Sequence, residues 1–245
     1  MRFITPIFDV KNLSLAISHQ AILKNITFQI FKGDYVAIIG PNGGGKTTLI
    51  RVLLSLEKPT SGEIRLYGKK LSTFKEWNKI GFVPQRASLI DTSFPASVEE
   101  IVSLGCLGKK DKDAIEEAMS KMDITHLRDK MIGKLSGGQR QRAMIARALA
   151  SKPEILILDE PNTGVDRESQ QRFYALLREL NQKDGITIVF ITHDVGVIAD
   201  DVTRVFTINQ RATICNNPKE LLSCDDMSQL YGIEAHLLHR HKHGH

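Results

Sequence analysis

Residues 35–54 read YVAIIGPNGGGKTTLIRVLL, and the fold can be worked out from this stretch outward. Its centre, 40–47, matches the pattern G-x-x-x-x-G-K-[ST] of a phosphate-binding loop. The apolar run 36–39 is typical of a buried parallel strand, and residues 48–54 carry apolar side chains at helical intervals. Because inward-pointing backbone N–H groups and a helix N-terminus favour an anion, this strand-to-helix turn predicts a nucleotide phosphate site.

The residues expected to hold the nucleotide run from the first glycine of the loop into the helix. Lys46 is expected to reach the outer phosphates, and the Thr47 hydroxyl to ligate magnesium. A glycine-rich turn without a ligand is the alternative, and the lysine, the threonine and the strand-to-helix setting together argue against it. The full set is Gly40, Pro41, Asn42, Gly43, Gly44, Gly45, Lys46, Thr47 and Thr48.

Composition narrows the class of protein. The chain has 245 residues, of which 42% are hydrophobic, so it can form one large domain or a core with a subdomain. No apolar run approaches the ~18 to 20 residues of a membrane span, and we expect a cytosolic protein. The formal net charge of +5 comes without a dense basic run outside the C-terminus, which disfavours nucleic acid as a partner. The three cysteines lack C-x-x-C spacing, so packing roles are expected for Cys106, Cys215 and Cys224.

Hydrophobic periodicity predicts an α/β fold with a helical insertion. Two antiparallel strands are expected at the N-terminus, and short apolar runs predict buried strands further along. Capping-box spacing at 97–100 and at 136–139 predicts two helix starts. The expected strands are 8–17, 22–30, 63–66, 80–83, 155–158 and 186–191, and the other expected helices are 111–122 and 167–180. The expected division is 1–87 with 153–222 as nucleotide-binding core and antiparallel β subdomain, 88–152 as helical subdomain, and 223–245 as C-terminal extension.

Two adjacent carboxylates follow the apolar run that ends at Leu158. Asp159 can hold the hydration shell of magnesium, and Glu160 can polarise a water for attack on the terminal phosphoryl group. A polar strand end is common by itself, but the phosphate loop upstream favours the catalytic interpretation.

These motifs together resemble the nucleotide-binding subunits of ABC transporters. The resemblance rests on GPNGGGKTT, Gln85, LSGGQ at 135–139, ILILDEP at 155–161 and His193, and it spans nearly the whole chain. It implies a P-loop NTPase core of ABC type with an antiparallel β subdomain and an inserted α-helical subdomain. ATP and magnesium are the implied cofactors.

The resemblance also implies a role for each matching residue. Gln85 would contact magnesium and the attacking water, and His193 the terminal phosphate. Asp166 would lie in a loop that meets the other subunit of a head-to-tail homodimer formed on ATP binding. In that dimer the signature of one subunit, Ser136, Gly137, Gly138 and Gln139, would close over ATP held by Lys46 of the other. A plain helix cap is the other interpretation of the signature, and the two can coexist.

One position departs from the family pattern. The family usually stacks adenine on an aromatic ring between the first two strands, and here Ile17, Ser18 and His19 occupy that region. Ile17 could offer a flat apolar contact and His19 could stack, so the preference for a base is left open.

The most similar subfamily is that of the zinc-importer ATPase subunits, which implies transport. An integral membrane permease would be the direct partner, an extracytoplasmic metal-binding protein an indirect one, and the chain would lie peripherally at the cytoplasmic face. Manganese or iron import and a soluble single-cassette ATPase are the alternatives. Apolar residues after Gln85 could line a groove for a partner helix or pack in the core; these are Leu89, Ile90, Phe94 and Val98.

The C-terminus supplies the indication of zinc. Residues 236–245 read HLLHRHKHGH and hold five of the eight histidines. Histidines two apart lie on one side of an extended chain, ~6.6 Å from each other, and could converge on a zinc ion. The proposed ligands are His239, His241, His243 and His245, with a solvated basic tail or a cloning remnant as the alternative.

Overall fold

The structure is a computed structural model that describes residues 5–85, 94–106, 108, 111–161, 167–193 and 202–216. It divides into two compact units that alternate along the sequence. The first comprises Met1–Phe31, Tyr35–Phe74 and Ile191–His245, and the second Lys32–Asp34 and Lys75–Phe190.

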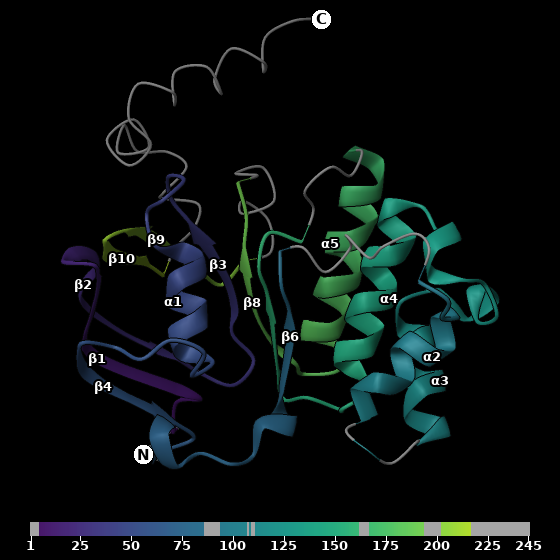
Figure 1. Cartoon of the computed structure of the whole chain (residues 1–245), viewed down its shortest axis with the longest axis horizontal. Helices are drawn as coiled ribbons and strands as arrows, with labels where there is room; N and C mark the ends of the chain where they lie inside the picture. Colours follow the sequence, from purple (N-terminus) through teal and green to yellow (C-terminus); the bar gives the residue numbers. More distant parts are fainter. Residues whose placement is uncertain are drawn as a thin grey trace, which may run out of the picture. The chain divides into compact units, whose positions relative to one another are not determined.

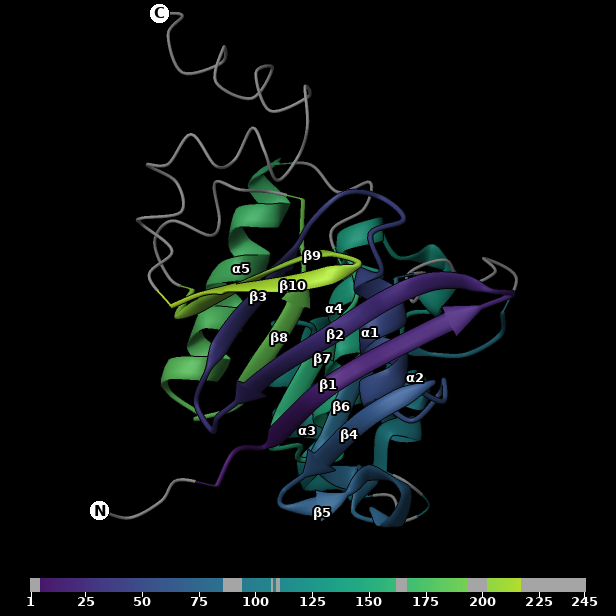
Figure 2. The ribbon, with the colours of Figure 1, turned by 90° about the vertical axis from the view of Figure 1, so that its left-hand side faces the viewer.

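A four-stranded antiparallel sheet forms one layer of the first unit (Figure 2). Its spatial order is β2-β1-β4-β5, built from β1 (Phe8–Ile17), β2 (Gln20–Ile30), β4 (Ser61–Leu66) and β5 (Lys69–Lys70). Ser18 and His19 have φ of 49° and 66° and form the two-residue turn that joins β1 to β2. Such a turn matches the twist of a hairpin, which explains why β2 begins at Gln20, before the predicted start at residue 22.

The phosphate loop belongs to the second layer of the same unit. Strand β3 (Tyr35–Ile39) is buried at every position and pairs in parallel with β9 (Arg204–Asn209), which pairs antiparallel with β10 (Arg211–Cys215). Helix α1 (Lys46–Leu53) follows the loop and buries Leu49, Ile50, Val52 and Leu53. The β9–β10 hairpin was not predicted, although it supports the loop from behind.

Three parallel strands and four helices make up the second unit. The strands are β6 (Ile80–Val83), β7 (Ile155–Leu158) and β8 (Thr187–Ile191), in the order β6-β7-β8. The near-continuous apolar runs of β7 and β8 are buried at every position, whereas β6 alternates between half-buried and buried residues. The helices are α2 (Val98–Ser103), α3 (Lys112–Lys121), α4 (Gly137–Leu149) and α5 (Arg167–Gln182), with α2 and α3 packed on α4 (Figure 1).

Short 3₁₀ turns connect these elements. They are η1 (Leu71–Thr73), η2 (Trp77–Lys79), η3 (Leu104–Cys106), η4 (Thr125–Leu127) and η5 (Ile132–Lys134). Gly105 in η3 lies so close to α4 that a Cβ there would meet the Arg147 carbonyl oxygen at 1.8 Å. Glycine is therefore what allows this turn to pack on the helix backbone.

Several other expectations can be compared with the structure. In the residues that the structure describes, no helix is long and apolar enough to cross a membrane. Val98 is fully buried, so it packs in the core and does not line a groove, whereas Phe94 is exposed. Cys106 and Cys215 are half-buried thiols. Leu89, Ile90, Cys224, Asp166 and the histidine-rich tail lie outside the described residues.

Candidate nucleotide site

The backbone of the phosphate loop is shaped by its glycines. Gly40, Gly43 and Gly45 have φ of 142°, 75° and 102°, values that side chains with a Cβ rarely adopt. A Cβ at Gly40 would lie 2.1 Å from the Ile208 carbonyl oxygen, and one at Gly44 would lie 2.7 Å from the same atom. The loop therefore rests directly on β9, with no room behind it for a side chain.

Lys46 is held inside the curve of the loop. It is 4% exposed, and its Nζ donates hydrogen bonds to the carbonyl oxygens of Gly40 and Pro41 at 2.9 and 3.0 Å. Helix α1 begins beside it with Gly45 as N-cap, and no side chain caps that end. A lysine ammonium beside an uncapped helix N-terminus fits a phosphate group.

The carboxylates lie at the end of β7 in the second unit. Asp159 is 2% exposed, and its backbone N–H donates to the Val83 carbonyl oxygen of the neighbouring strand at 2.9 Å. Glu160 has φ of 45°, an unusual value for a residue other than glycine, asparagine or aspartate. Its Oε2 accepts a hydrogen bond from Gln85 Nε2 at 2.6 Å. The structure thus joins two predicted site residues that are 75 positions apart.

Both halves of the capping box are present at the signature. Ser136 Oγ accepts from the Gln139 N–H at 3.3 Å, and Gln139 Oε1 accepts from the Ser136 N–H at 3.1 Å. A Cβ at Gly137 would meet no atom within 4 Å, and one at Gly138 only the Ser169 Cβ at 3.9 Å. The start of α4 is therefore open to a ligand.

A cleft of about 260 Å³ lies beside this helix start, within the second unit. Cationic side chains predominate among its charged lining groups, with Arg142 and Arg172 against Asp123. Arg142 Nη1 lies 3.5 Å from Asp123 Oδ2. Arg172 forms an ion pair with Glu168 on its own helix, so the feature that favours an anion here is the positive end of the α4 dipole.

Comparison with known proteins agrees with this set of motifs. Residues 23–163, more than half of the chain, match the family model described as ABC transporter. The chain belongs to the ABC transporter family. Its fold is accordingly the P-loop NTPase core of ABC type, with an antiparallel β subdomain and inserted helices.

Two relatives and one solved structure illustrate the place of this chain within the ABC family. The zinc uptake system ATP-binding protein ZurA of Listeria innocua is 44% identical over 84% of this chain and 83% of its own length. The zinc import ATP-binding protein ZnuC of Pasteurella multocida is 36% identical over 98% of this chain and 88% of its own. The dimeric ATP-binding cassette MJ0796, bound to ADP and phosphate after hydrolysis, matches with a TM-score of 0.73 and 28% identity over 85% and 98% of the two chains.

Two further residues singled out in the sequence lie in the first unit of this ABC cassette. His193 is exposed and follows Thr192, whose N–H donates to the Ile38 carbonyl oxygen near the end of β3. Ile17 lies two residues beyond the buried Leu15 on β1, but it is 47% exposed. Leu23 of the same hairpin lies against Gly45, which places β1 and β2 beside the phosphate loop.

Sequence reasoning missed the support that β9 and β10 give to the phosphate loop. Ile208 lies behind Gly40 and Gly44, and the Gln210 N–H donates to the Gly44 carbonyl oxygen at 2.9 Å. The available signal was the run RVFTIN at 204–209, in which three of six residues are apolar. That pattern indicates a strand but not its partner.

Proposed function

We propose that this chain is the ATP-hydrolysing subunit that powers a membrane importer of zinc ions. The observation that carries the proposal is the hydrogen bond of 2.6 Å by which Gln85 holds the Glu160 carboxylate, in a chain that also contains a phosphate loop with Lys46 inside its curve. Membership of the ABC family supports ATP as the nucleotide, and relatives named for zinc uptake support the cargo.

The residues of the chain divide the work between binding and chemistry. The loop backbone and Lys46 bind the phosphate groups, and the signature at Ser136 binds the nucleotide held by a second copy. Glu160 polarises the attacking water, and Gln85 orients the Glu160 carboxylate by hydrogen bonding. Thr47 and Asp159 offer the oxygen donors that magnesium prefers, and the ion would supply positive charge against the phosphate oxygens when bound.

The partners proposed follow from this role. We propose an ATP-dependent head-to-tail homodimer, an integral membrane permease at the cytoplasmic face and, indirectly, an extracytoplasmic metal-binding protein. The dimeric state of MJ0796 supports the first of these. Import of manganese or iron is the second candidate. The ion would cross the membrane through the permease, so the permease, and not this chain, would select it. Identifying the co-purifying membrane protein, and then the ion whose depletion it remedies, decides between these cargoes.

The first prediction concerns ATP turnover. Lys46→Ala should abolish productive ATP binding because it removes the cation inside the loop. Glu160→Gln should bind ATP but lose at least ~100-fold in turnover, the usual scale for a positioned base. Measured by phosphate release, an unchanged rate in the glutamine variant would rule out Glu160 as the catalytic carboxylate.

The same glutamine variant tests the dimer. Because it binds ATP without hydrolysing it, sedimentation should show a dimer with ATP and a monomer without it. Adding Ser136→Arg should prevent the dimer, since the bulky side chain fills the open start of α4. An ATP-bound monomer of Glu160→Gln alone would contradict closure of two copies over the nucleotide.

The second prediction concerns the tail, for which we propose reversible zinc binding by His239, His241, His243 and His245. Fixing four histidines of one short polar segment around an ion costs conformational entropy, so the affinity should be lower than at a folded structural site. A chain that ends at Leu238 should keep its basal ATPase rate and lose zinc stoichiometry in calorimetry. Equal zinc binding by both chains would refute the tail site and weaken the case for zinc.

A further inference from the structure

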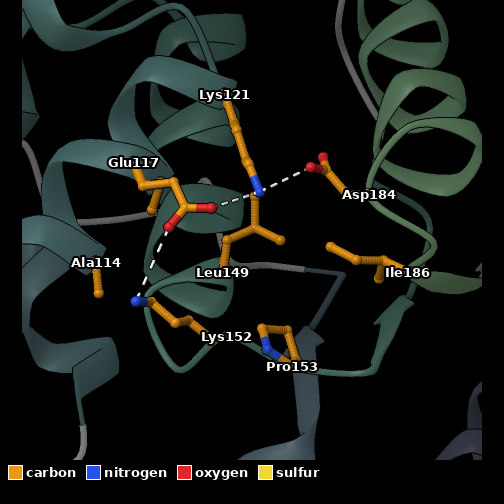
Figure 3. Close-up of a pocket in the computed structure, with 9 residues that line it drawn as sticks. Ala114, Glu117, Lys121, Leu149, Lys152, Pro153, Asp184 and Ile186 are labelled. Carbon is orange, nitrogen blue, oxygen red and sulfur yellow. Dashed lines mark ion pairs between the residues drawn. The ribbon is translucent and has the colours of Figure 1, made fainter.

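A second cleft, of about 290 Å³, lies where α4 gives way to β7 in the second unit (Figure 3). Leu149, Lys152 and Pro153 line one part of it, on the segment that leads out of α4. Asp184 and Ile186 line another part, in the turn between α5 and β8. The cleft therefore lies between the helices α3 and α4 on one side and the turn that leads from α5 into β8 on the other.

One ammonium group spans this cleft. Lys121 Nζ, at the end of α3, lies 2.8 Å from Glu117 Oε1 one turn earlier on the same helix. The same nitrogen lies 3.0 Å from Asp184 Oδ1 on the opposite wall, and Figure 3 shows it between the two carboxylates. Desolvation lowers the pKa of Lys121, but the hydrogen bonds to Glu117 and Asp184 outweigh it and raise the pKa above its ordinary value. Lys121 is thus charged whenever the pair can form.

Each partner of this ion pair is tied to a part of the candidate site. On the helical side, Asp123 follows α3 and forms an ion pair with Arg142 of α4, the helix that begins at the signature. On the sheet side, Asp184 precedes β8, which pairs with β7 from Thr187↔Ile155 onward. Strand β7 ends at Asp159 and Glu160.

The polypeptide chain also connects α4 to the sheet beside this cleft. The segment 150–154 runs from α4 to β7, and it is fixed to the sheet by hydrogen bonds from the Glu154 N–H to the Lys79 oxygen and from the Thr187 N–H to the Glu154 oxygen. Helix α4 also packs against β6 of this sheet, and rotation of the helix takes place about the segment and this contact. A second tether across the cleft restricts that rotation.

We propose that Lys121 and Asp184 are positioning residues for ATP hydrolysis, because their ion pair sets the angle between the signature helix α4 and the strand β7 that carries Asp159 and Glu160. The inference rests on the proposed function and adds a control point to it. Neither side chain touches the nucleotide; both act through the helix and the strand.

The ion pair between Lys121 and Asp184 is strong enough to favour one orientation of α4 relative to β7. It is also weak enough to be broken in each round of ATP hydrolysis. The side chains of Lys121 and Asp184 are 28% and 32% exposed, so water and salt screen their attraction in part. Pairs of this kind shift an equilibrium by about two- to five-fold. An ion pair of this strength changes the rate of ATP turnover, and the protein does not need it in order to fold.

The test compares Lys121→Met and Asp184→Asn with a matched pair on α5. Glu179 of α5 and Lys183, the residue directly after that helix, lie 2.9 Å apart, so Lys183→Met and Glu179→Gln remove an ion pair that bridges no cleft. Lys121→Arg should keep the tether. Glu117→Gln removes the contact within α3 and the 4.0 Å ion pair with Lys152, and it leaves the contact between Lys121 and Asp184 in place.

Amide hydrogen exchange in the full chain without nucleotide is the first readout. In Lys121→Met and Asp184→Asn, exchange at Lys152 and Glu154 should accelerate about two- to five-fold, and the α5 variants should match the parent. Raising the salt concentration should reproduce the acceleration in the parent and leave the two variants unchanged. Equal exchange in Asp184→Asn and the parent at low salt overturns the tether.

Turnover is the second readout. The tether variants should lose about two- to five-fold in kcat with unchanged ATP affinity, because the phosphate loop belongs to the other unit, and Lys121→Arg should restore the rate. Accelerated exchange with unchanged kcat overturns the positioning role. If the parent hydrolyses no ATP, the proposed function fails, and the exchange experiment still decides by itself whether the tether exists.

Discussion

Gly40 shows how a single residue type controls the phosphate loop. Its φ of 142° and the Ile208 oxygen 2.1 Å from a Cβ position exclude every side chain. Gly40→Ala should therefore displace the loop from β9 and cost more than ~3 kcal/mol of folding free energy, as strained and overpacked backbone positions do. Urea unfolding measures the cost, and ATP binding should be lost as well.

Gly33 provides the control for Gly40→Ala. Its φ is 85°, so alanine is strained there too, but a Cβ would meet no atom within 4 Å. Gly33→Ala should cost only about 1 to 2 kcal/mol and leave ATP binding intact. Similar losses in the two variants would mean that backbone strain alone, and not the approach to Ile208, requires glycine at residue 40.

The chemical identity of the site residues could be predicted from the sequence, but their contacts could not. The motif assigns Lys46 to phosphate, yet nothing in it indicates that the ammonium hydrogen-bonds to the Gly40 and Pro41 oxygens. The link from Gln85 to Glu160 joins two strand ends far apart in sequence, and local patterns carry no information about such a pair. Lys121 was missed for the same reason.

Two helices begin with the same capping box, which separates a structural role from a ligand-binding one. Ser97 caps α2 and Ser136 caps α4, each with a reciprocal hydrogen bond from the third residue along. Ser97→Ala and Ser136→Ala should each lower the free energy of unfolding by ~1 kcal/mol. Only Ser136→Ala should also lower ATP turnover, by about ten-fold or more, the scale of a lost hydrogen bond to a charged ligand.

Phosphate release and urea unfolding measured on both serine variants check this expectation. Ser97 is the suitable reference because its box has the same geometry, with Glu100 in place of Gln139. If both substitutions lowered turnover equally, the signature serine would act only by stabilising its helix.

At the level of elements, the apolar runs predicted β3, β7 and β8 closely because strands covered on both faces need apolar side chains at nearly every position. The shorter apolar run of β6 was also predicted, although two of its four residues are only half-buried. Capping spacing located the starts of α2 and α4. Strands β5, β9 and β10 were not predicted. β5 has only two residues, and β9 is a strand because it pairs with β3, from which it is separated by most of the chain.

For the molecule as a whole, the two compact units alternate along the chain, and Lys32–Asp34 lies in the second although its neighbours on both sides lie in the first. The phosphate loop belongs to one unit and the carboxylates to the other. Their meeting at one nucleotide stays a prediction from the sequence, as does the division at residues 88 and 152. Neither unit is a contiguous segment, so truncation cannot isolate either of them.

Strand β5 has a consequence for how the protein behaves in a crowded cell. It is the outermost strand of the four-stranded sheet, and an outer strand offers its backbone to any other chain that is partly unfolded. Here that border is two residues long and consists of exposed Lys69 and Lys70. A second molecule that aligned there would bring like charges together over too short a length for a stable ladder. This border of the sheet is thus protected against pairing with another chain.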